Sequence, residues 1–232
     1  MEGRIVTMKS DEAAPDVRRQ LSDENFSAVV RQNLAAGLAM RTPQDMQDSL
    51  EEILRQHAPD ADLHVFGYGS LMWNPALEHD AQFRARVHGW HRRFCLRNLV
   101  GRGTPEFPGL MLALDRGGSC NGLLLRIPAA KVRQELHLLW RREMSWGSYD
   151  ARWVAAWVDG APVRALTFVV HRGHARYVKG LSLQESAGFI NGGRGSLGSC
   201  RAYFDATLQK MRELGIRDAG MERLQAAVGN TA

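Results

Sequence analysis

The chain lacks the features that mark several large protein classes. It has only three cysteines in 232 residues, and no two of them are close in sequence. This argues against a disulfide scaffold or a zinc site of the usual spacing, and favours a reducing, cytoplasmic location. No apolar run reaches the eighteen or more residues that a membrane-spanning helix needs. We find no secretory signal behind the first residues and no internal repeat.

Common cofactor and nucleophile motifs are also missing. The glycines around Tyr68 are not followed by the Gly-Lys-Ser/Thr of a phosphate-binding loop, and they lack the spacing of a dinucleotide fingerprint. Ser70 is not in a Gly-x-Ser-x-Gly elbow. None of the eight histidines has a carboxylate or cysteine partner at metal-ligand spacing. These absences argue against a phosphate-binding loop, a dinucleotide site, a serine hydrolase and a histidine metal site.

The charge is positive but dispersed. The formal net charge is +5, and the basic residues occur singly or in pairs along the chain. Nucleic-acid-binding proteins usually concentrate such charge on one face or in a recognisable module, so we expect no nucleic-acid partner. A mildly basic surface also suits a small anionic substrate.

Residues 1–60 differ from the rest because they contain no strand signal. We interpret them as an N-terminal helical extension whose first 20 residues, polar and without periodicity, are disordered. One helix is expected after Ser22, through Val29, Val30 and Leu34. A second has Thr42 as its N-cap and Pro43 at its first position. Both helices are expected to pack on the main domain or on a neighbouring chain.

Residues 61–232 carry the strand signals and are expected to form the main domain. Short strands are predicted at residues 64–66 and 84–96. Gly117-Gly118 and Asp159-Gly160 each lie between two apolar runs, which predicts two hairpins. A helix is expected between these hairpins, at residues 128–144. Hairpins with an inserted helix favour an α+β domain with a small antiparallel barrel and flanking helices.

The C-terminal part is predicted to be helical. Residues 182–185 (SLQE) have the pattern of a capping box that opens a helix. A further helix is expected from about Ser199 to Leu214, with Gly215 as its C-terminal stop.

Glu143 is the candidate acid/base because of its place on a predicted helix. Val132, Leu136, Leu139 and Glu143 share one helical face, whereas Arg141 and Arg142 are expected to point elsewhere. Burial favours the protonated form of a carboxyl group, which then exchanges protons near neutral pH. The alternative is that Glu143 lies where the helix frays and pairs with an arginine. Aromatic neighbours, including Trp140, Trp146 and Tyr149, favour a pocket wall.

A glycine-rich turn follows the first predicted strand. In residues 66–71 (FGYGSL), two glycines allow other groups to approach the backbone closely. Successive N–H groups in such a turn can bind a carboxylate or a phosphate. An ordinary tight turn would show the same pattern.

Four motifs together resemble those of the ChaC-type, glutathione-specific γ-glutamylcyclotransferases, in the order found in that family. They are residues 65–75 (VFGYGSLMWNP), residues 102–109 (RGTPEFPG), Arg142-Glu143 with the later Tyr149, and residues 195–199 (GSLGS) with Tyr203. The resemblance covers residues 63 to about 215. It implies a γ-glutamyl cyclotransferase-like fold.

The sequence departs from the family's pattern at three places. Residues 144–148 (MSWGS) lengthen the link between Glu143 and Tyr149. Leu197 and Cys200 stand where serine and asparagine are usual. Residues 174–177 (HARY) only partly preserve a proline-asparagine-tyrosine element.

The resemblance implies cleavage of glutathione to 5-oxoproline and Cys-Gly without a cofactor. The α-amine of the substrate would attack the γ-carbonyl, with Glu143 as general acid/base. Tyr68, Gly69, Ser70 and Leu71 would bind the γ-glutamyl carboxylate, and Tyr149 and Tyr203 would line the site. Arg102 is either a ligand for an anionic substrate group or structural. Two alternatives stay open: a cyclotransferase for other γ-glutamyl amino acids or amines, and a non-catalytic regulatory γ-glutamyl-binding protein.

Overall fold

The computed structural model describes residues 18–19, 21, 26–27, 30–31 and 39–230 of the chain. Along the chain, its elements are α3 (Pro43–Arg55), β1 (Leu63–Gly67), η1 (Ser70–Met72), β2 (Ala81–Asn98), β3 (Gly109–Ile127), η2 (Ala129–Lys131), α4 (Val132–Glu143), β4 (Tyr149–Val158), β5 (Ala161–Val170), α5 (Leu183–Gly192), β6 (Arg194–Gly195), β7 (Gly198–Ser199), α6 (Cys200–Glu213) and α7 (Ala219–Gly229).

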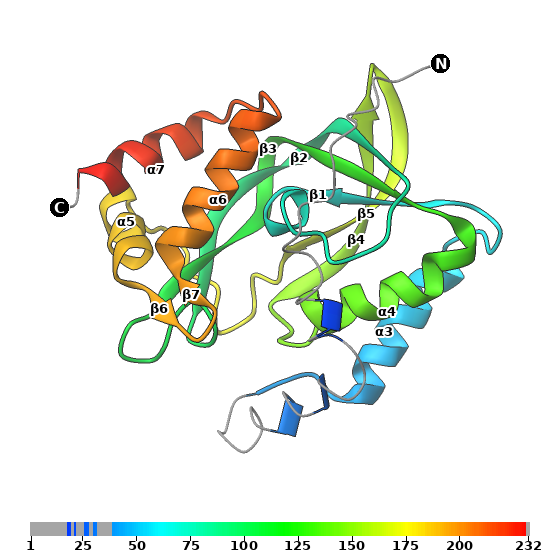
Figure 1. Ribbon diagram of the computed structural model, residues 1–232, viewed down its shortest axis with the longest axis horizontal. Coiled ribbons are helices and arrows are strands. Elements are labelled where there is room, and N and C mark those ends of the chain that lie inside the picture. Colours follow the sequence, from blue (N-terminus) through cyan, green and yellow to red (C-terminus); the bar gives the residue numbers. More distant parts are fainter. Residues whose placement is uncertain (1–17, 20, 22–25, 28–29, 32–38, 231–232) are drawn as a thin grey trace.

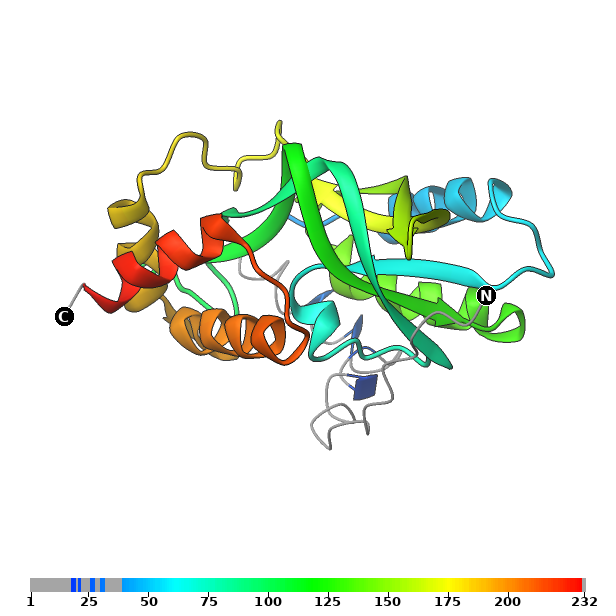
Figure 2. The same cartoon turned by 90° about the horizontal axis from the view of Figure 1, so that it is seen from above.

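Strands β1 to β5 form a closed barrel in the order β1-β3-β2-β4-β5. Neighbouring strands are antiparallel, except that β5 runs parallel to β1 and β3 where it closes the barrel. Helices α3 and α4 lie at one end of the molecule, and α5, α6 and α7 lie at the other (Figure 1, Figure 2). The expected α+β fold with a small mixed barrel and flanking helices is therefore confirmed.

The hairpin predicted around Gly117 and Gly118 is wrong. Residues 109–127 form a single strand, β3, which pairs with β2 from one end to the other. The two glycines have φ angles of 100° and 69° and lie opposite the single residue Gly89, so they form a bulge. Glycine adopts positive φ equally readily in a bulge and in a tight turn, which made the pattern ambiguous. The real connection between β2 and β3 is residues 99–108, which contain Arg102.

The second hairpin prediction is confirmed. Strands β4 and β5 pair in continuous register across Asp159 and Gly160. Both residues have positive φ, at 48° and 82°, as a type I′ turn requires.

Helix α3 was predicted from its start signals and packs on α4. Thr42 caps it and forms a capping box with Asp45, and Pro43 is its first residue. Leu50 and Ile53 are buried in the main core. The Trp140 indole of α4 donates a hydrogen bond to Ser49 Oγ at 2.9 Å. The α3 face is therefore continuous with the core of the barrel.

Two of the three C-terminal helices match the predictions. Ser182 forms a capping box with Glu185 at the start of α5, and Ser199 caps α6. Gly215 follows α6 with a φ of 61°, as expected of a helix stop. Helix α7, capped by Asp218, was not predicted.

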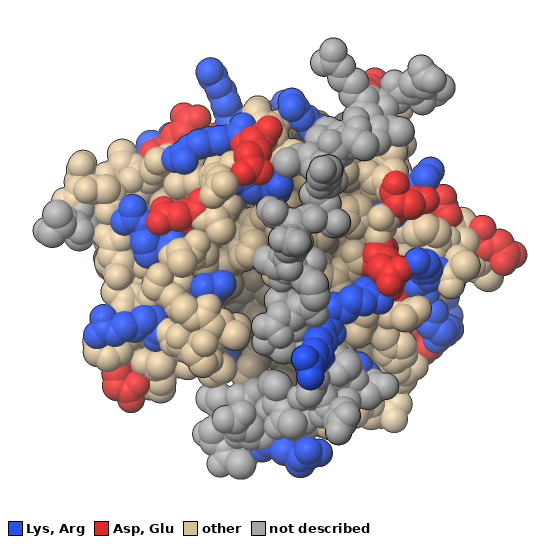
Figure 3. Space-filling model, viewed as in Figure 1, with Lys and Arg blue, Asp and Glu red and all other residues tan. Residues whose placement is uncertain are grey.

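The helix expected after Ser22 and the disorder expected for residues 1–20 fall almost wholly outside the described residues. Arg18 is described, and its guanidinium pairs with the buried carboxylate of Glu135 on α4 at 2.6 and 2.7 Å. In the part of the chain that the structure describes, no helix is long and apolar enough to cross a membrane. On the face drawn in Figure 3, basic and acidic side chains are interspersed.

Candidate active site

Glu143 is the last residue of α4, and its side chain is largely buried. The apolar face predicted for this helix is confirmed, because Val132, Leu136 and Leu139 are all in the core. The Glu143 side chain is only 14% exposed, and its Oε1 lies 3.0 Å from Nε of Arg142. Burial raises the pKa of Glu143, although the Arg142 charge and its hydrogen bond oppose the shift. Both alternatives from the sequence thus hold in part: the carboxyl is buried, and it is paired.

The glycine turn joins β1 to the short helix η1. A Cβ on Gly67 would lie 2.9 Å from Leu71 Cβ, so this position accepts only glycine without rearrangement. The N–H groups of Met72, Trp73 and Asn74 bond to carbonyls of the turn. Among the described residues, no hydrogen-bond acceptor is found for the N–H groups of Gly69, Ser70 and Leu71. Leu71 is itself buried, and its side chain belongs to the main core.

Arg142 connects Glu143 to this turn. Its Nη2 donates to Ser70 Oγ at 2.9 Å, and its Nη1 donates to the Asn74 carbonyl at 2.5 Å. The expectation that Arg142 points away from the site is therefore wrong. A long side chain near the end of a helix can turn back toward a neighbouring loop, and helical projection ignores this freedom. Through one guanidinium, Glu143 and the turn are fixed relative to each other.

Three tyrosines lie close enough to Glu143 to be influenced by its charge. The Tyr68 hydroxyl donates to the Phe168 carbonyl and the Tyr149 hydroxyl to the Leu112 carbonyl, each at 2.8 Å. Burial raises the pKa of Tyr68, Tyr149 and Tyr203, and the charge of Glu143 adds to each shift. All three phenols therefore stay neutral and can donate hydrogen bonds. Tyr203 packs between the rings of Trp73 and Phe94, and its hydroxyl lies 3.2 Å from where a Gly69 Cβ would be.

Arg102 lies on the Tyr203 side of the site. Its Nη1 donates to the Ser199 carbonyl at 3.5 Å, and its backbone N–H donates to Asn98 Oδ1 at 3.1 Å. Burial lowers the pKa of Arg102, while the nearby Tyr203 opposes that shift. Within the described part of the chain, no carboxylate pairs with it.

Two further residues belong to the site and were not predicted. From the sequence, Arg142 was noted only as part of a motif. Its place directly before Glu143 was the signal that could have identified it as a site residue. The Asn74 Oδ1 atom is buried and has no hydrogen-bond partner among the described residues. A buried oxygen without a donor can accept a hydrogen bond from a ligand amine. Asn74 lies in the motif of residues 65–75, but nothing in its spacing singled it out.

The turn is also held from the opposite side. Arg92 is buried and donates through Nε to the Tyr68 carbonyl at 2.7 Å. Its Nη1 pairs with Asp218 Oδ2 at 2.8 Å. Because Asp218 also caps α7, this helix supports the turn through Arg92.

The departure at Cys200 is structural. Cys200 is buried, its Sγ accepts a hydrogen bond from the Leu110 N–H at 3.3 Å, and it donates to the Leu110 carbonyl at 3.1 Å. Burial raises its pKa, so the thiol is neutral. No group of three or more metal-binding side chains occurs in the described ranges.

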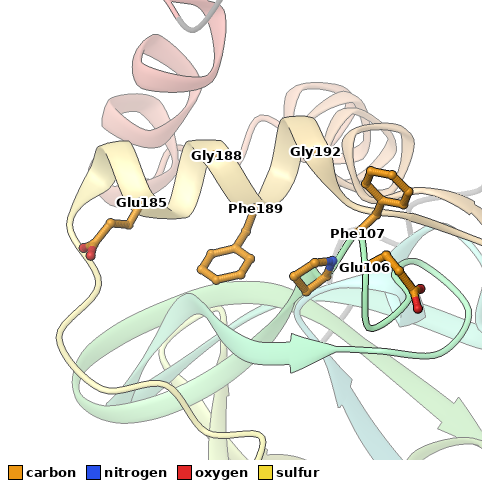
Figure 4. A pocket seen from close by; sticks show the side chains of 7 residues that line it. Glu106, Phe107, Glu185, Gly188, Phe189 and Gly192 are labelled. Atoms are coloured by element: carbon orange, nitrogen blue, oxygen red, sulfur yellow. The ribbon is translucent and has the colours of Figure 1, made fainter.

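A surface hollow between residues 106–108 and α5 is separate from this site (Figure 4). Its lining includes the rings of Phe107 and Phe189, flanked by Glu106 and Glu185. None of the predicted site residues lines it.

The comparisons with known proteins identify the family and the fold. Residues 63–231 match the family model described as ChaC-like protein. The chain belongs to the ChaC-like family. The "Glutathione-specific gamma-glutamylcyclotransferase" of Escherichia coli (strain K12) is 40% identical over 181 residues, covering 78% of each chain. The protein of the same name from Schizosaccharomyces pombe is 30% identical over 179 residues, covering 68% of this chain and 86% of its own.

A solved structure confirms the fold of this ChaC-like chain. The crystal structure of a yeast γ-glutamyl cyclotransferase specific to glutathione superposes with a TM-score of 0.68 at 18% identity. The match covers 73% of this chain and 96% of the yeast chain. The family and the γ-glutamyl cyclotransferase-like fold expected from the four motifs are therefore confirmed.

Proposed function

We propose that this ChaC-like chain is a γ-glutamylcyclotransferase that converts glutathione to 5-oxoproline and Cys-Gly. The observation that carries the proposal is the buried carboxyl of Glu143, joined through Arg142 to a turn with available N–H groups. The names of its E. coli and S. pombe relatives support glutathione as the substrate. The assignment of individual site residues is part of the proposal.

The turn is the proposed binding site for the γ-glutamyl carboxylate. The N–H groups of Gly69, Ser70 and Leu71 would donate to its oxygens. Asn74 Oδ1 provides an acceptor near the turn for the α-amine. Fixing both groups places the amine next to the γ-carbonyl of the same molecule. Since the attack is intramolecular, the protein gains a large effective concentration by holding this conformation.

Glu143 is the proposed proton carrier. The α-amine is mostly protonated at neutral pH, so a base must take a proton before its nitrogen attacks the γ-carbon. Glu143 would accept that proton and return it to the nitrogen of Cys-Gly as the bond from the γ-carbon to that nitrogen breaks. The ring nitrogen, positively charged after its attack, would lose a second proton by the same route, so that Cys-Gly leaves with a protonated amine. Burial helps because it moves the pKa of the carboxyl toward the pH at which it works.

The neutral tyrosines and Arg102 would complete the site. Tyr203 lies against the turn and would donate a hydrogen bond to the substrate, and Tyr68 and Tyr149 would form its walls. Arg102, which has no carboxylate partner among the described residues, is a candidate for an anionic group of the substrate. The division into an N-terminal extension (residues 1–60) and a catalytic domain (residues 61–232) remains a prediction. A cytoplasmic location also remains a prediction.

The test is the conversion of Glu143 to glutamine. We expect Glu143→Gln to keep the fold and to reduce 5-oxoproline release from glutathione by about 100-fold or more, the usual contribution of a positioned acid/base. Glu222→Gln, the same change at an exposed position of α7, is the matched control and should retain full activity. Equal rates for wild type and Glu143→Gln would refute the role of Glu143. A parallel panel of γ-glutamyl amino acids and amines measures whether glutathione is preferred.

A further inference from the structure

The segment between β5 and α5 is hydrogen-bonded to the end of β2. The Arg97 N–H donates to the Arg176 carbonyl, and the Val178 N–H donates to the Cys95 carbonyl, each at 2.8 Å. Leu96 and Tyr177 form a β-bridge between these two contacts. The backbone on both sides of Tyr177, the residue after Arg176, is therefore fixed by β2.

Side chains anchor the same segment to β3. Asp115 is 1% exposed and accepts from Arg172 Nε at 2.6 Å and from the Tyr177 hydroxyl at 2.9 Å. These two donors lie on either side of Arg176 in the sequence. Arg176 is thus presented from a segment with two independent anchors, which is the kind of support that a binding residue needs.

The Arg176 guanidinium has an aromatic partner but no anionic one. It lies 4.4 Å from the ring centre of Trp146, within the range of a cation–π contact. Within the described part of the chain, its guanidinium forms no ion pair. Arg176 is partly buried, and this burial lowers its pKa against the influence of Tyr149. A guanidinium stacked by its face keeps its N–H groups in the plane, where they can still meet a carboxylate.

Arg176 is linked to the candidate active site through Trp146 and Tyr149. Trp146 lies in residues 144–148, which connect Glu143 to Tyr149, and Tyr149 is close enough to influence the charge of Arg176. The surroundings add positive charge, since the Arg41 guanidinium borders Gly147. His174 also borders Gly147, but burial lowers its pKa, so it adds no charge at neutral pH. The carboxylate of Asp150 is already paired with His171 at 3.1 Å. A partly buried cation thus lies over Trp146, three residues after Glu143 in the chain, with no anionic partner among the described residues.

We propose that Arg176, stacked on Trp146, is a specificity-determining residue that binds the carboxylate at the far end of a γ-glutamyl peptide. In glutathione this group is the glycine carboxylate. The inference rests on the proposed function and extends it, because the turn near Ser70 takes the first carboxylate and Arg176 takes the second. Two of the three places where the sequence departs from the family's pattern, residues 144–148 and 174–177, contribute to this contact.

The experiment compares glutathione with glutathione esterified at its glycine carboxylate. In the wild type, the ester should have a KM about 10-fold higher, the usual effect of losing a hydrogen bond to a charged group. In Arg176→Gln, the KM for glutathione should rise by a similar factor, and the ester should no longer be distinguished from it. The kcat should stay within about twofold, because Arg176 does not touch the reacting atoms. Arg176→Lys should recover part of the discrimination.

The matched control is Lys179→Gln, which removes one positive charge from an exposed position of the same segment and should change nothing. The proposal is overturned if Arg176→Gln still discriminates fully between the two substrates. It is also overturned if the discrimination disappears in Arg102→Gln instead, since Arg102 would then hold the glycine carboxylate. A wild-type protein that released no 5-oxoproline from any γ-glutamyl compound would refute the proposed function itself, and this inference with it.

Discussion

Two buried carboxylates, Glu143 and Asp115, have opposite electrostatic surroundings. Asp115 accepts hydrogen bonds from Arg172, Arg93, Tyr177 and the Arg116 N–H. Burial opposes its ionisation, but these donors outweigh it and lower its pKa. Glu143 pairs with Arg142 alone among the described residues, and Arg142 also bonds to Ser70 and to the Asn74 carbonyl. For Glu143, burial prevails and raises the pKa.

The difference separates a structural carboxylate from one that is suited to exchange protons. A carboxylate whose oxygens are saturated by fixed donors stays ionised and holds its partners in place. A carboxylate with a single shared donor keeps acceptor capacity for a substrate and gains a pKa closer to neutrality. Burial alone does not distinguish the two, whereas the number of donors does.

The largest expected effect is on stability, at Asp115. Asp115→Asn leaves two arginines with a weaker partner in a buried site, and we expect the free energy of unfolding to fall by about 3 kcal/mol. Denaturant unfolding of both proteins measures this. Asp205→Asn removes an exposed pair with Arg201 on α6 and should cost no more than about 0.5 kcal/mol. An equally small loss at Asp115 would erase the proposed difference between the two carboxylates.

The next effect concerns Arg142. Arg142→Gln should reduce kcat by roughly 10- to 100-fold, because the turn and Glu143 lose their common donor. Without the arginine charge, the pKa of Glu143 should rise further, so the acid side of the pH–rate profile should move to higher pH. Arg133→Gln, at an exposed position of the same helix, serves as the control and should leave the profile unchanged. If kcat fell but the pH–rate profile did not shift, Arg142 would have a structural role only.

The smallest effect is a difference between two pH values: the pH at which activity is lost on acidification and the lower pH at which the fold is lost. Glu143 must be ionised to act as a base, so kcat/KM should fall about tenfold per pH unit as the pH drops below its raised pKa. Asp115 has a lowered pKa in the folded state, so its contribution to stability is present above its unfolded pKa and is lost as the pH falls through the folded value. Activity should therefore disappear reversibly at a higher pH than the fold. Rate and circular dichroism measurements on the same samples test this, and coincident transitions would contradict it.

Local signals predicted much of the fold. The caps at Thr42, Ser182 and Ser199 and the turn at Asp159-Gly160 are each determined by a few neighbouring residues. The error at Gly117-Gly118 arose because a bulge and a turn need the same backbone freedom. Only the partner strand decides between them, and pairing with β2 is a long-range property.

The sequence predicted which residues form the candidate site, but not how their side chains are arranged in space. Helical periodicity identified Glu143, and the motifs identified the turn and Tyr203. The bridge through Arg142 depends on the direction of a long flexible side chain toward a distant loop. The stacking of Arg176 on Trp146 joins residues that are thirty positions apart, so no local pattern could have shown it.

The hydrogen bond between Ser49 and Trp140 joins α3, which precedes the residues that match the family model, to the helix that carries Glu143. Trp140 precedes Glu143 by one turn of α4, and its ring is packed against Phe168 inside the barrel. If the chain were cut between α3 and β1 and α3 departed, the indole N–H would lose its acceptor, and Leu50 and Ile53 would leave the main core. Residues 43–55 therefore complete the packing of the helix that ends in the proposed catalytic group.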